Sequence, residues 1–431
     1  MGNMVKKLVD ATTLDQLLQQ LFPICRSITG DGLRQTLKIV QEYIPLEVHE
    51  IPSGTAVFDW TVPREWNIKG AYIKGPAGDT IVDFKKNNLH VMGYSTPIRT
   101  RMTLSELRPH LYSIPEKPDI IPYKTSYYKE NWGFGITHDQ LQNLIEGTYE
   151  VVIDSTLIDG SLTYGELYVQ GTSANEVLIS CYPCHPSMAN DNLSGVVLTT
   201  LLAQHMLTAK PRYSYRFLFV PETIGAIAWL ARNKENTERI KYGLVATCVG
   251  DAGHFTYKKS RRGNAAIDRI VTRVLKEAGV EHEIIDFFPL GSDERQYCSP
   301  GFDLPVGSLM RTMYYKFPQY HTSADDLSFV RGEHLMRTSL MYRNVFDAIE
   351  RAKIYRNTNP NCEPQLGKRN LYEAVGGMNH EGPMQVLMWV LNLSDGTYSL
   401  EDIAERSHID LKIITEASEV LLAHKLIEPI T

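Results

Sequence analysis

The sequence predicts an α/β fold built on a mostly parallel sheet with helices on both faces. Short apolar, β-rich runs alternate with helical segments from residue 176 to residue 353, and this alternation is typical of strands joined by crossover helices. Several of these strands end on a polar side chain. In open α/β sheets that edge is where ligands bind.

Two other regions differ from this pattern. Residues 47–171 contain short alternating runs separated by Pro, Gly and Asn, which predict a β-rich unit inserted before the main sheet. The end of the chain predicts three short helices and a wing. We therefore expect a discontinuous, two-segment α/β domain, an inserted β-rich domain and a winged-helix domain, at 1–46 with 172–360, at 47–171 and at 361–431 respectively.

Apolar periodicity gives the individual elements. Leu17, Leu18 and Leu21 form one face of a first helix, and a second helix follows a break at 27–32. In the central region we expect strands at 176–182, 212–220, 242–249 and 302–310, and helices at 196–207, 226–233, 264–278 and 335–352. In the last segment we expect helices at 384–393, 400–407 and 411–422, a wing at 424–430, and a capping box formed by Ser399 and Asp402.

The composition is that of a globular protein with a large core, since 43% of the residues are hydrophobic. A net charge of -6 argues against a general nucleic-acid or anionic-membrane binder. No apolar run could span a membrane, and residues 1–20 lack the apolar centre of a signal peptide, so a cytoplasmic location is expected. The six cysteines are irregularly spaced and predict reduced thiols; Cys181 and Cys184 give only a weak zinc or redox signal.

The predicted winged helix lacks the charge of a DNA-binding module. Residues 384–431 hold eight acidic and three basic residues, a net charge of -5 with His neutral. A surface that binds phosphates needs the opposite sign. We therefore expect no nucleic acid, and favour a protein contact or the dimerisation of two copies of the chain.

Four strand ends supply groups suited to metal-assisted hydrolysis. The loop after the first central strand holds His185 and Asp191, directly before a helix. The second strand ends on Glu222, the third leads to Asp251, and His321 stands in a polar turn after an aromatic segment. Imidazole and carboxylate together suit zinc. The two histidines and two aspartates are therefore the candidate metal ligands.

Glu222 is the candidate catalytic residue. Zinc lowers the pKa of a bound water to about 7 and polarises a carbonyl group. A carboxylate near the metal but not bound to it then takes the proton of the water and returns it to the leaving amine. If Glu222 were itself a ligand, the site would lack this general base.

These motifs resemble those of the M28-type zinc aminopeptidases and their glutaminyl-cyclase relatives. The Asp-Asn-x-Ser-Gly run at 191–195 is similar to the family's bridging-aspartate motif, Glu222 to the first of its paired glutamates, and His321 to its last metal-binding His. The segment 291–293 resembles a Ser-Asp segment of the family. The whole chain is similar to a bacterial aminopeptidase-like group that combines this zinc-exopeptidase-like domain with an inserted β-domain and a winged helix, and that is associated with polysaccharide biosynthesis.

The chain also departs from the family pattern. Ser187 stands where the family has an Asp that orients the first His, and Thr223 stands where a second Glu holds one of two metals. Asp251 lies a few residues later than the family's strand-end ligand. The resemblance implies Zn²⁺ as the cofactor, with one or two ions. For a single ion the ligands would be Asp191, His321 and either His185 or Asp251.

Candidates for substrate binding carry a weaker signal. Arg295 and Tyr314 suit a substrate carboxylate or a developing oxyanion, and the resemblance adds Asp293. A surface Arg and a packed Tyr are the plainer interpretation. The aromatic residues at 127–134 could line a substrate cleft, although a small hydrophobic core around a loop is favoured.

The sequence thus predicts a hydrolase of the aminopeptidase type, which cleaves an amide bond next to a free amine in a peptide or small amide. An amide or N-acyl hydrolase acting on a glycan precursor is a second interpretation. A third, of another class, is an inactive peptidase fold that serves as a binding or scaffold protein. No membrane partner is expected for any of them.

Overall fold

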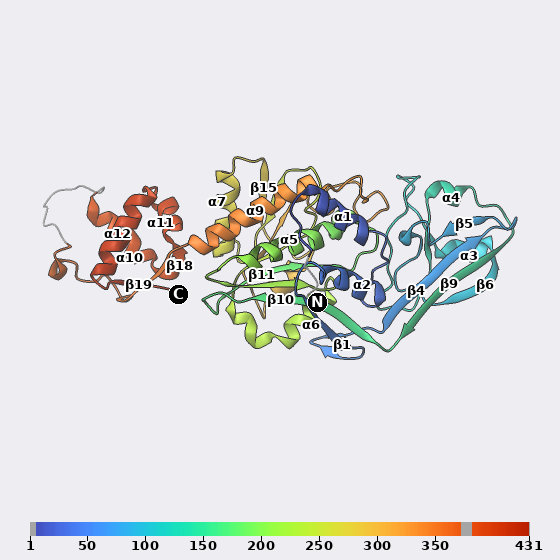
Figure 1. The fold of residues 1–431 in the computed structure, drawn as a ribbon, viewed down its shortest axis with the longest axis horizontal. Coiled ribbons are helices and arrows are strands. Elements are labelled where there is room, and N and C mark those ends of the chain that lie inside the picture. Colours follow the sequence, from blue (N-terminus) through green and yellow to red (C-terminus); the bar gives the residue numbers. More distant parts are fainter. Residues whose placement is uncertain (1–5, 372–381, 431) are drawn as a thin grey trace. The chain divides into compact units, whose positions relative to one another are not determined.

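The structure is a computed structural model that describes residues 6–371 and 382–430 (Figure 1). The chain divides into two compact units, the first made of Met1–Asp268 and Leu275–Arg343, the second of Arg269–Val274 and Asn344–Thr431. Within the described ranges no helix is long and apolar enough to cross a membrane. Residues 1–20 were predicted to lack the apolar centre of a signal peptide, and the first five of them lie outside the described residues. The cytoplasmic location stays a prediction.

The first unit is built on an eight-stranded sheet. Its strands β12, β11, β13 and β16 are parallel, whereas β1, β10 and β14 each pair antiparallel with a neighbour, so the sheet is mixed. Every residue of β11 is buried, as expected for a strand covered on both faces. Across the sheet the strands are β1 (Glu47–Pro52), β10 (Ser161–Val169), β12 (Ser214–Phe219), β11 (Glu176–Cys181), β13 (Ile240–Val245), β16 (Val306–Met310), β14 (Phe255–Lys258) and β15 (His282–Ile285).

Helices cover both faces of this sheet, which confirms the predicted fold class. α5 (Ser194–Thr208) packs against β11 and β12, and α6 (Ile224–Arg232) packs against β10. Figure 1 shows α1 and α5 on one side of the sheet and α6 on the other. Outside the insert, the remaining helices before residue 352 are α1 (Ala11–Leu21), α2 (Asp31–Val40), α7 (Ala266–Glu277), α8 (Glu294–Tyr297) and α9 (Gly332–Arg351), and a 3₁₀ segment lies at Lys234–Arg239.

Two strand ends differ from the expected ranges. β13 stops at Val245 because the next residues leave the sheet and form a buried loop that contains Asp251. β16 starts at Val306 because a tight turn, closed by hydrogen bonds to the Ser299 carbonyl, precedes it. The short strands β14 and β15 were not expected from the sequence.

Most of the residues between β1 and β10 form the inserted β-rich part. The insert was expected to span 47–171, but β1 and β10 belong to the large sheet, where Ile51 and Leu162 are paired and fully buried. The separate part therefore lies between these two strands. Its four-stranded antiparallel sheet has the order β5 (Thr80–Asp83), β4 (Glu65–Lys74), β9 (Thr148–Ile158) and β6 (Ile98–Thr103). Smaller elements are β2 (Ala56–Val57), β3 (Trp60–Thr61), β7 (Leu111–Tyr112), β8 (Phe134–Gly135), α3 (Leu104–Leu107), α4 (His138–Gln142) and 3₁₀ turns at Asn88–His90 and Arg108–His110.

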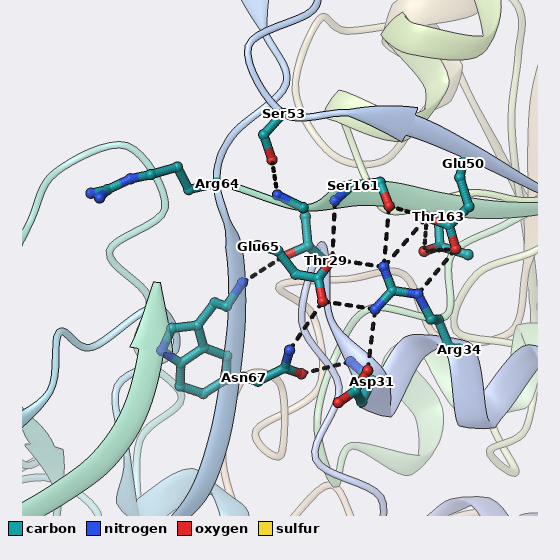
Figure 2. A network of polar contacts seen from close by, with 12 residues as sticks. Thr29, Asp31, Arg34, Glu50, Ser53, Arg64, Glu65, Asn67, Ser161 and Thr163 are labelled. Atoms are coloured by element: carbon teal, nitrogen blue, oxygen red, sulfur yellow. Dashed lines mark hydrogen bonds and ion pairs between the residues drawn. The ribbon is translucent and has the colours of Figure 1, made fainter. Parts of the chain in front are cut away.

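A polar network fixes the place where the chain enters and leaves the insert (Figure 2). The guanidinium of Arg34, on α2, donates to Glu50 of β1, with Nε 3.0 Å from Oε1, and to Glu65 of β4, with Nη2 2.6 Å from Oε2. Glu65 Oε2 also accepts the backbone N–H of Ser161, the first residue of β10. One arginine thus ties the outgoing strand β4 and the returning strand β10 to α2.

The second unit contains the winged helix. Its helices are α10 (Pro383–Leu393), α11 (Leu400–Ser407) and α12 (Leu411–Ala423). Its sheet has the order β18 (Asp395–Ser399), β17 (Ile354–Asn357) and β19 (Ile427–Pro429), and a 3₁₀ turn lies at Gly367–Arg369. The capping box of Ser399 and Asp402 is present. β17 shows that this unit begins before residue 361, the expected boundary. On α12, Ile413 is 46% exposed and Val420 is 39% exposed. That the winged helix binds protein and no nucleic acid stays a prediction.

Candidate metal centre and active site

The loop after β11 brings buried polar groups to one point. It carries His185 and then a π-helical turn, Ala189–Leu193, which includes Asp191. The carboxylate of Asp325 holds this turn, since it accepts the N–H of Asn190 at 2.6 Å and that of Asp191 at 2.9 Å. Burial raises the pKa of Asp325 to about 7, although these two donors act in the opposite direction.

Three of the four candidate ligands come together. His185, Asp191 and His321 each offer one ligand atom, and these atoms lie within 4.8 Å of one another. His321 Nε2 is 2.9 Å from Asp191 Oδ2, and His185 Nδ1 is 3.5 Å from Asp191 Oδ1. Tyr320 stacks on the His321 ring with centroids 3.9 Å apart, which helps to fix the plane of that imidazole.

One polar atom of each residue in this cluster has no hydrogen-bond partner in the described part of the chain and is available to a metal. Among the described residues, His185 Nδ1, Asp191 Oδ2 and His321 Nε2 are buried without a hydrogen-bond partner. Buried polar atoms are nearly always paired, so an orphaned set calls for an ion or a ligand. Two imidazoles and one carboxylate are also a donor set of catalytic zinc sites, which keep a fourth position open. The residues present therefore fit a zinc ion.

Opposite charges couple His185 and Asp191 within the cluster. Burial alone would lower the pKa of His185, but the charge of Asp191 raises it well above its usual range. Burial would raise the pKa of Asp191, but His185 and His321 hold it well below its usual range. An imidazolium–carboxylate pair is therefore favoured without metal, and a metal would displace the proton because its ligands must be deprotonated.

Tyr182 holds the carboxylate of Asp191. Its hydroxyl donates to Asp191 Oδ1 at 2.5 Å and lies 2.6 Å from Thr247 Oγ1. Thr223 stands where the family has a second Glu and brings no carboxylate to the site, so the described residues supply the ligands of one ion. Tyr182 was not singled out from the sequence because it reads as the last residue of an apolar strand.

Glu222, which follows β12, lies beside the cluster without joining it. Its Oε2 is 3.4 Å from His185 Nε2, and its side chain is 23% exposed. The backbone N–H of Glu222 donates to Cys184 Sγ at 3.2 Å, which links the two strand-end loops. Cys184 is buried, and all six cysteines are free, as expected. A partly exposed carboxylate next to buried ligands has the position that a general base requires.

Two of the expected substrate-binding residues hold the residue after Glu222. Thr223 has a left-handed backbone, with φ 65°. Asp293 accepts its N–H at 2.7 Å, and Arg295 donates to its hydroxyl at 2.7 Å. Burial, with the charge of Glu222, raises the pKa of Asp293 well above its usual range. Asp293 Oδ2 and Arg295 Nε are buried and have no hydrogen-bond partner among the described residues, so both side chains keep unused polar atoms near Glu222.

Asp251, the fourth candidate ligand, does not join the cluster. Its Oδ1 accepts the Thr312 hydroxyl at 2.6 Å and the Gly253 N–H at 2.7 Å. Its Oδ2 accepts the Asn190 amide at 3.0 Å and the Thr312 N–H at 3.2 Å. Four hydrogen bonds use the acceptor sites of this carboxylate. Asp251 therefore fixes the loops around it, and its assignment as a ligand is corrected.

Tyr314, expected to bind substrate, also lies in a buried network. It is 2% exposed, and its hydroxyl is 3.0 Å from Lys258 Nζ and 3.2 Å from Glu294 Oε1. Lys258 also pairs with Glu294 at 2.7 Å. Because all three groups are buried and bonded to one another, Tyr314 stabilises the core. The plainer interpretation of a packed Tyr was the right one here.

His185 is held by residues that its motif did not identify. Arg26, 1% exposed, donates from Nε to the His185 carbonyl at 2.9 Å. Ser187 donates to the Phe22 carbonyl at 3.1 Å and accepts the Asn88 amide at 2.7 Å. Ser187 thus ties the loop to its neighbours, in place of the ring-orienting role of the family's Asp.

The aromatic residues at 127–134 mostly belong to a hydrophobic core. Phe134 lies in this core, and Trp132 and Tyr127 pack against it as partly buried residues, as favoured from the sequence. Tyr127 is partly exposed, and its hydroxyl lies 2.7 Å from that of Tyr123. Tyr123 was missed in the sequence because nothing in the spacing of the insert points to the metal ligands.

The fold of this protein is similar to that of solved zinc aminopeptidases and M28-type peptidases. BSAP, a zinc aminopeptidase from Bacillus subtilis, matches with a TM-score of 0.57 at 11% identity, over 79% of this chain and 95% of that chain. An M28 peptidase precursor from Shewanella amazonensis matches with a TM-score of 0.52 at 14% identity, over 78% and 95%. These likenesses concern the fold alone, and they confirm the resemblance predicted from the motifs.

The chain belongs to the family described as Domain of unknown function (DUF4910), whose model matches residues 15–352; a winged helix-turn-helix model matches residues 353–429. A Clostridium acetobutylicum protein is 54% identical over 414 residues, 96% of this chain and 95% of that protein. Its provisional name is polysaccharide biosynthesis protein with aminopeptidase-like domain. A crystal structure of a provisionally assigned peptidase from Clostridium acetobutylicum has a TM-score of 0.82 at 52% identity, over 97% and 96% of the two chains.

Proposed function

We propose that this protein is a zinc-dependent hydrolase of the aminopeptidase type, which cleaves an amide bond next to a free amine. One observation carries the proposal: the orphaned ligand atoms of His185, Asp191 and His321 lie beside a carboxylate, Glu222, that has stayed out of the cluster. A binding protein has no need of that combination, whereas metal-assisted hydrolysis requires both parts.

The residues have separate roles in this proposal. When bound, zinc supplies the Lewis acidity that lowers the pKa of water and polarises a carbonyl. The carboxylate of Glu222 accepts a proton from the attacking water and returns it to the leaving nitrogen. Tyr182 and Asp325 hold Asp191 in place, because one donates to its side chain and the other accepts its backbone N–H.

Polar atoms near Glu222 support recognition of a charged or polar substrate group. Arg295 Nε and Asp293 Oδ2 are buried without a hydrogen-bond partner among the described residues. A substrate amine suits the oxygen of Asp293, and a substrate carbonyl or carboxylate suits the N–H of Arg295. These two residues therefore stay the proposed substrate contacts, and Tyr314 is no longer one of them.

A second candidate substrate is an N-acylated or amide-bearing glycan precursor. The rings of Trp60 and Tyr128 are 39% and 54% exposed, and they pack edge to face with centroids 5.4 Å apart. Tyr128 directly follows Tyr127, and exposed aromatic faces suit sugar rings. The name of the Clostridium acetobutylicum relative, which refers to polysaccharide biosynthesis, supports the same substrate class.

The test combines zinc content with turnover. Wild type, Glu222→Gln and the surface control Glu281→Gln are loaded with zinc and assayed on aminoacyl p-nitroanilides and on N-acetylated amino sugars. We expect about one zinc ion per chain in all three proteins. We expect Glu222→Gln to lose about 10²–10⁴-fold in kcat, since it removes the general base.

The outcome also separates the candidate functions. Turnover of the anilides supports the aminopeptidase, and turnover of the acetylated sugars alone supports the glycan-precursor hydrolase. A wild type that binds no added zinc, or a Glu222→Gln protein as active as wild type, contradicts the proposal. Zinc binding without turnover of either class favours an inactive, ligand-binding peptidase fold.

A further inference from the structure

A segment of the inserted part lies directly alongside the loop that carries His321. The N–H of Tyr123 donates to the His321 carbonyl at 2.9 Å. Ile121 and Ser323 exchange two hydrogen bonds, one from the Ser323 N–H at 2.9 Å and one to the Ser323 hydroxyl at 3.0 Å. The insert is therefore joined by its backbone to a loop of the candidate metal centre.

This segment places one aromatic ring against both imidazoles of the cluster. Tyr123 packs edge-on against His185, with centroids 5.3 Å apart, and against His321, with centroids 5.2 Å apart. Its hydroxyl lies 2.7 Å from the hydroxyl of Tyr127, whose ring packs edge-on against Tyr94. Tyr123 and Tyr127 are partly buried, and both phenols lie near enough to Glu222 to interact with its charge.

The two hydroxyls together have one O–H donor that is not used in their mutual hydrogen bond. Two phenols carry two O–H protons, and the hydrogen bond between them uses one. Within the described part of the chain, neither hydroxyl has a second hydrogen-bond partner. An ordinary phenol has a pKa of about 10, so both groups keep their protons at neutral pH.

We propose that the Tyr123–Tyr127 hydroxyl pair donates a hydrogen bond to the carbonyl oxygen of the scissile amide, so that the inserted part completes the active site. The inference rests on the proposed amide hydrolysis and adds a substrate-binding group to it. A hydroxyl held by its neighbour can stabilise the charge that develops on this oxygen without reorganising during the reaction. The pair forms no covalent bond and gives up no proton.

The test uses phenylalanine substitutions that keep both rings. Tyr123→Phe, Tyr127→Phe and the double variant are compared with wild type and with Tyr168→Phe, which removes a hydroxyl from a side chain on β10 that is 41% exposed. For each zinc-loaded, full-length protein we would measure zinc content, kcat and KM on the active substrate, and the Kd of leucine hydroxamate, whose carbonyl oxygen resembles that of an amide.

We expect the double variant to lose about 10²-fold in kcat, the effect of removing one preorganised donor. Its Kd for leucine hydroxamate should rise by about tenfold, the effect of one lost hydrogen bond. Each single variant should lose less, because the remaining hydroxyl can still donate. Zinc content should stay the same in all variants, and Tyr168→Phe should match wild type in every measurement.

Several outcomes would overturn the inference. A double variant within twofold of wild type in both kcat and hydroxamate affinity shows that the pair does not bind the substrate oxygen. A loss of zinc in parallel with activity shows that the pair positions the ligands instead. A wild type without zinc removes the proposed function and this role together. Weaker hydroxamate binding by the double variant, with no amide turned over by wild type, supports the donor and contradicts only the proposed hydrolysis.

Discussion

Asp191 and Asp251 are two aspartates in loops that follow neighbouring parallel strands, β11 and β13, and each is 1% exposed. Their side chains nevertheless have different surroundings. Asp251 accepts four hydrogen bonds, two on each oxygen. Asp191 accepts one on Oδ1, from Tyr182, and none on Oδ2. Strand-end position and burial are therefore shared by a candidate ligand and by a residue that only holds loops.

The difference has a simple physical cause. A buried carboxylate oxygen without a partner is costly, so it is either bonded by the protein or directed at an ion. Asp251 receives donors from Gly253 in its own loop, from Thr312 after β16 and from Asn190 in the loop after β11. The loop after β11 instead turns Asp191 toward His185 and His321. The number of available donors, more than the residue type, separates the two aspartates.

The largest expected effect is the loss of zinc when a ligand of the cluster is removed. Loss of a residue that only hydrogen-bonds a metal ligand lowers metal affinity by about 10–100-fold. Asp191→Ala and His321→Ala each remove a ligand, so they should lower zinc affinity by more than this. His185→Ala should also lower zinc affinity, and that result would identify His185 as the third ligand. The measurement is a zinc titration of each variant against a competing chelator, with circular dichroism to show that the variant is folded. Unchanged affinity in folded Asp191→Ala protein would break the comparison.

A smaller and different effect is expected for Asp251→Asn. The amide can accept at only one of the two positions, so two of the four hydrogen bonds are lost and the free energy of unfolding should fall by about 3 kcal/mol. The variant should still bind about one zinc ion at saturating zinc. Urea unfolding of wild type and variant gives the first quantity, and metal analysis the second. Loss of zinc from stable Asp251→Asn protein would return Asp251 to the ligand set.

The smallest effect concerns a third carboxylate, Glu65, which pairs with Arg34 away from the cluster (Figure 2). The hydrogen bonds of Arg34 lower the pKa of Glu65 from 4.5 to about 2. A pKa lowered by folding contributes stability above 4.5 that is lost as the pH falls toward 2. Glu65→Gln should therefore be less stable than wild type by about 2 kcal/mol at pH 7. The gap should narrow as the pH falls below 4.5.

Urea unfolding midpoints of wild type and Glu65→Gln at pH 7, 5, 4 and 3 would measure this gap. Each pair is compared at one pH, so the titration of other groups cancels. A gap that stays constant from pH 7 to pH 3 would show that the pair with Arg34 does not depend on the ionisation of Glu65.

Local sequence predicted the elements well where the apolar period was clear. α5, α6 and the strands β11 and β12 lie within a few residues of their expected ranges, because their buried faces are continuous in the sequence. β1 and β10 were assigned to the insert, since the alternation along a strand is the same whichever sheet the strand joins. The winged helix followed from its helix lengths and from the cap at Ser399.

By itself, the sequence determined which residue types stand at the strand ends, and so it identified His185, Asp191, Glu222 and His321. Tertiary structure alone decided which of these lie together and how each is satisfied. It filled the acceptor sites of Asp251, left Asp191 Oδ2 open, and brought Tyr123 of the insert to the imidazoles. The physical reason is that hydrogen-bond partners come from residues far apart in the chain, and no local pattern records them.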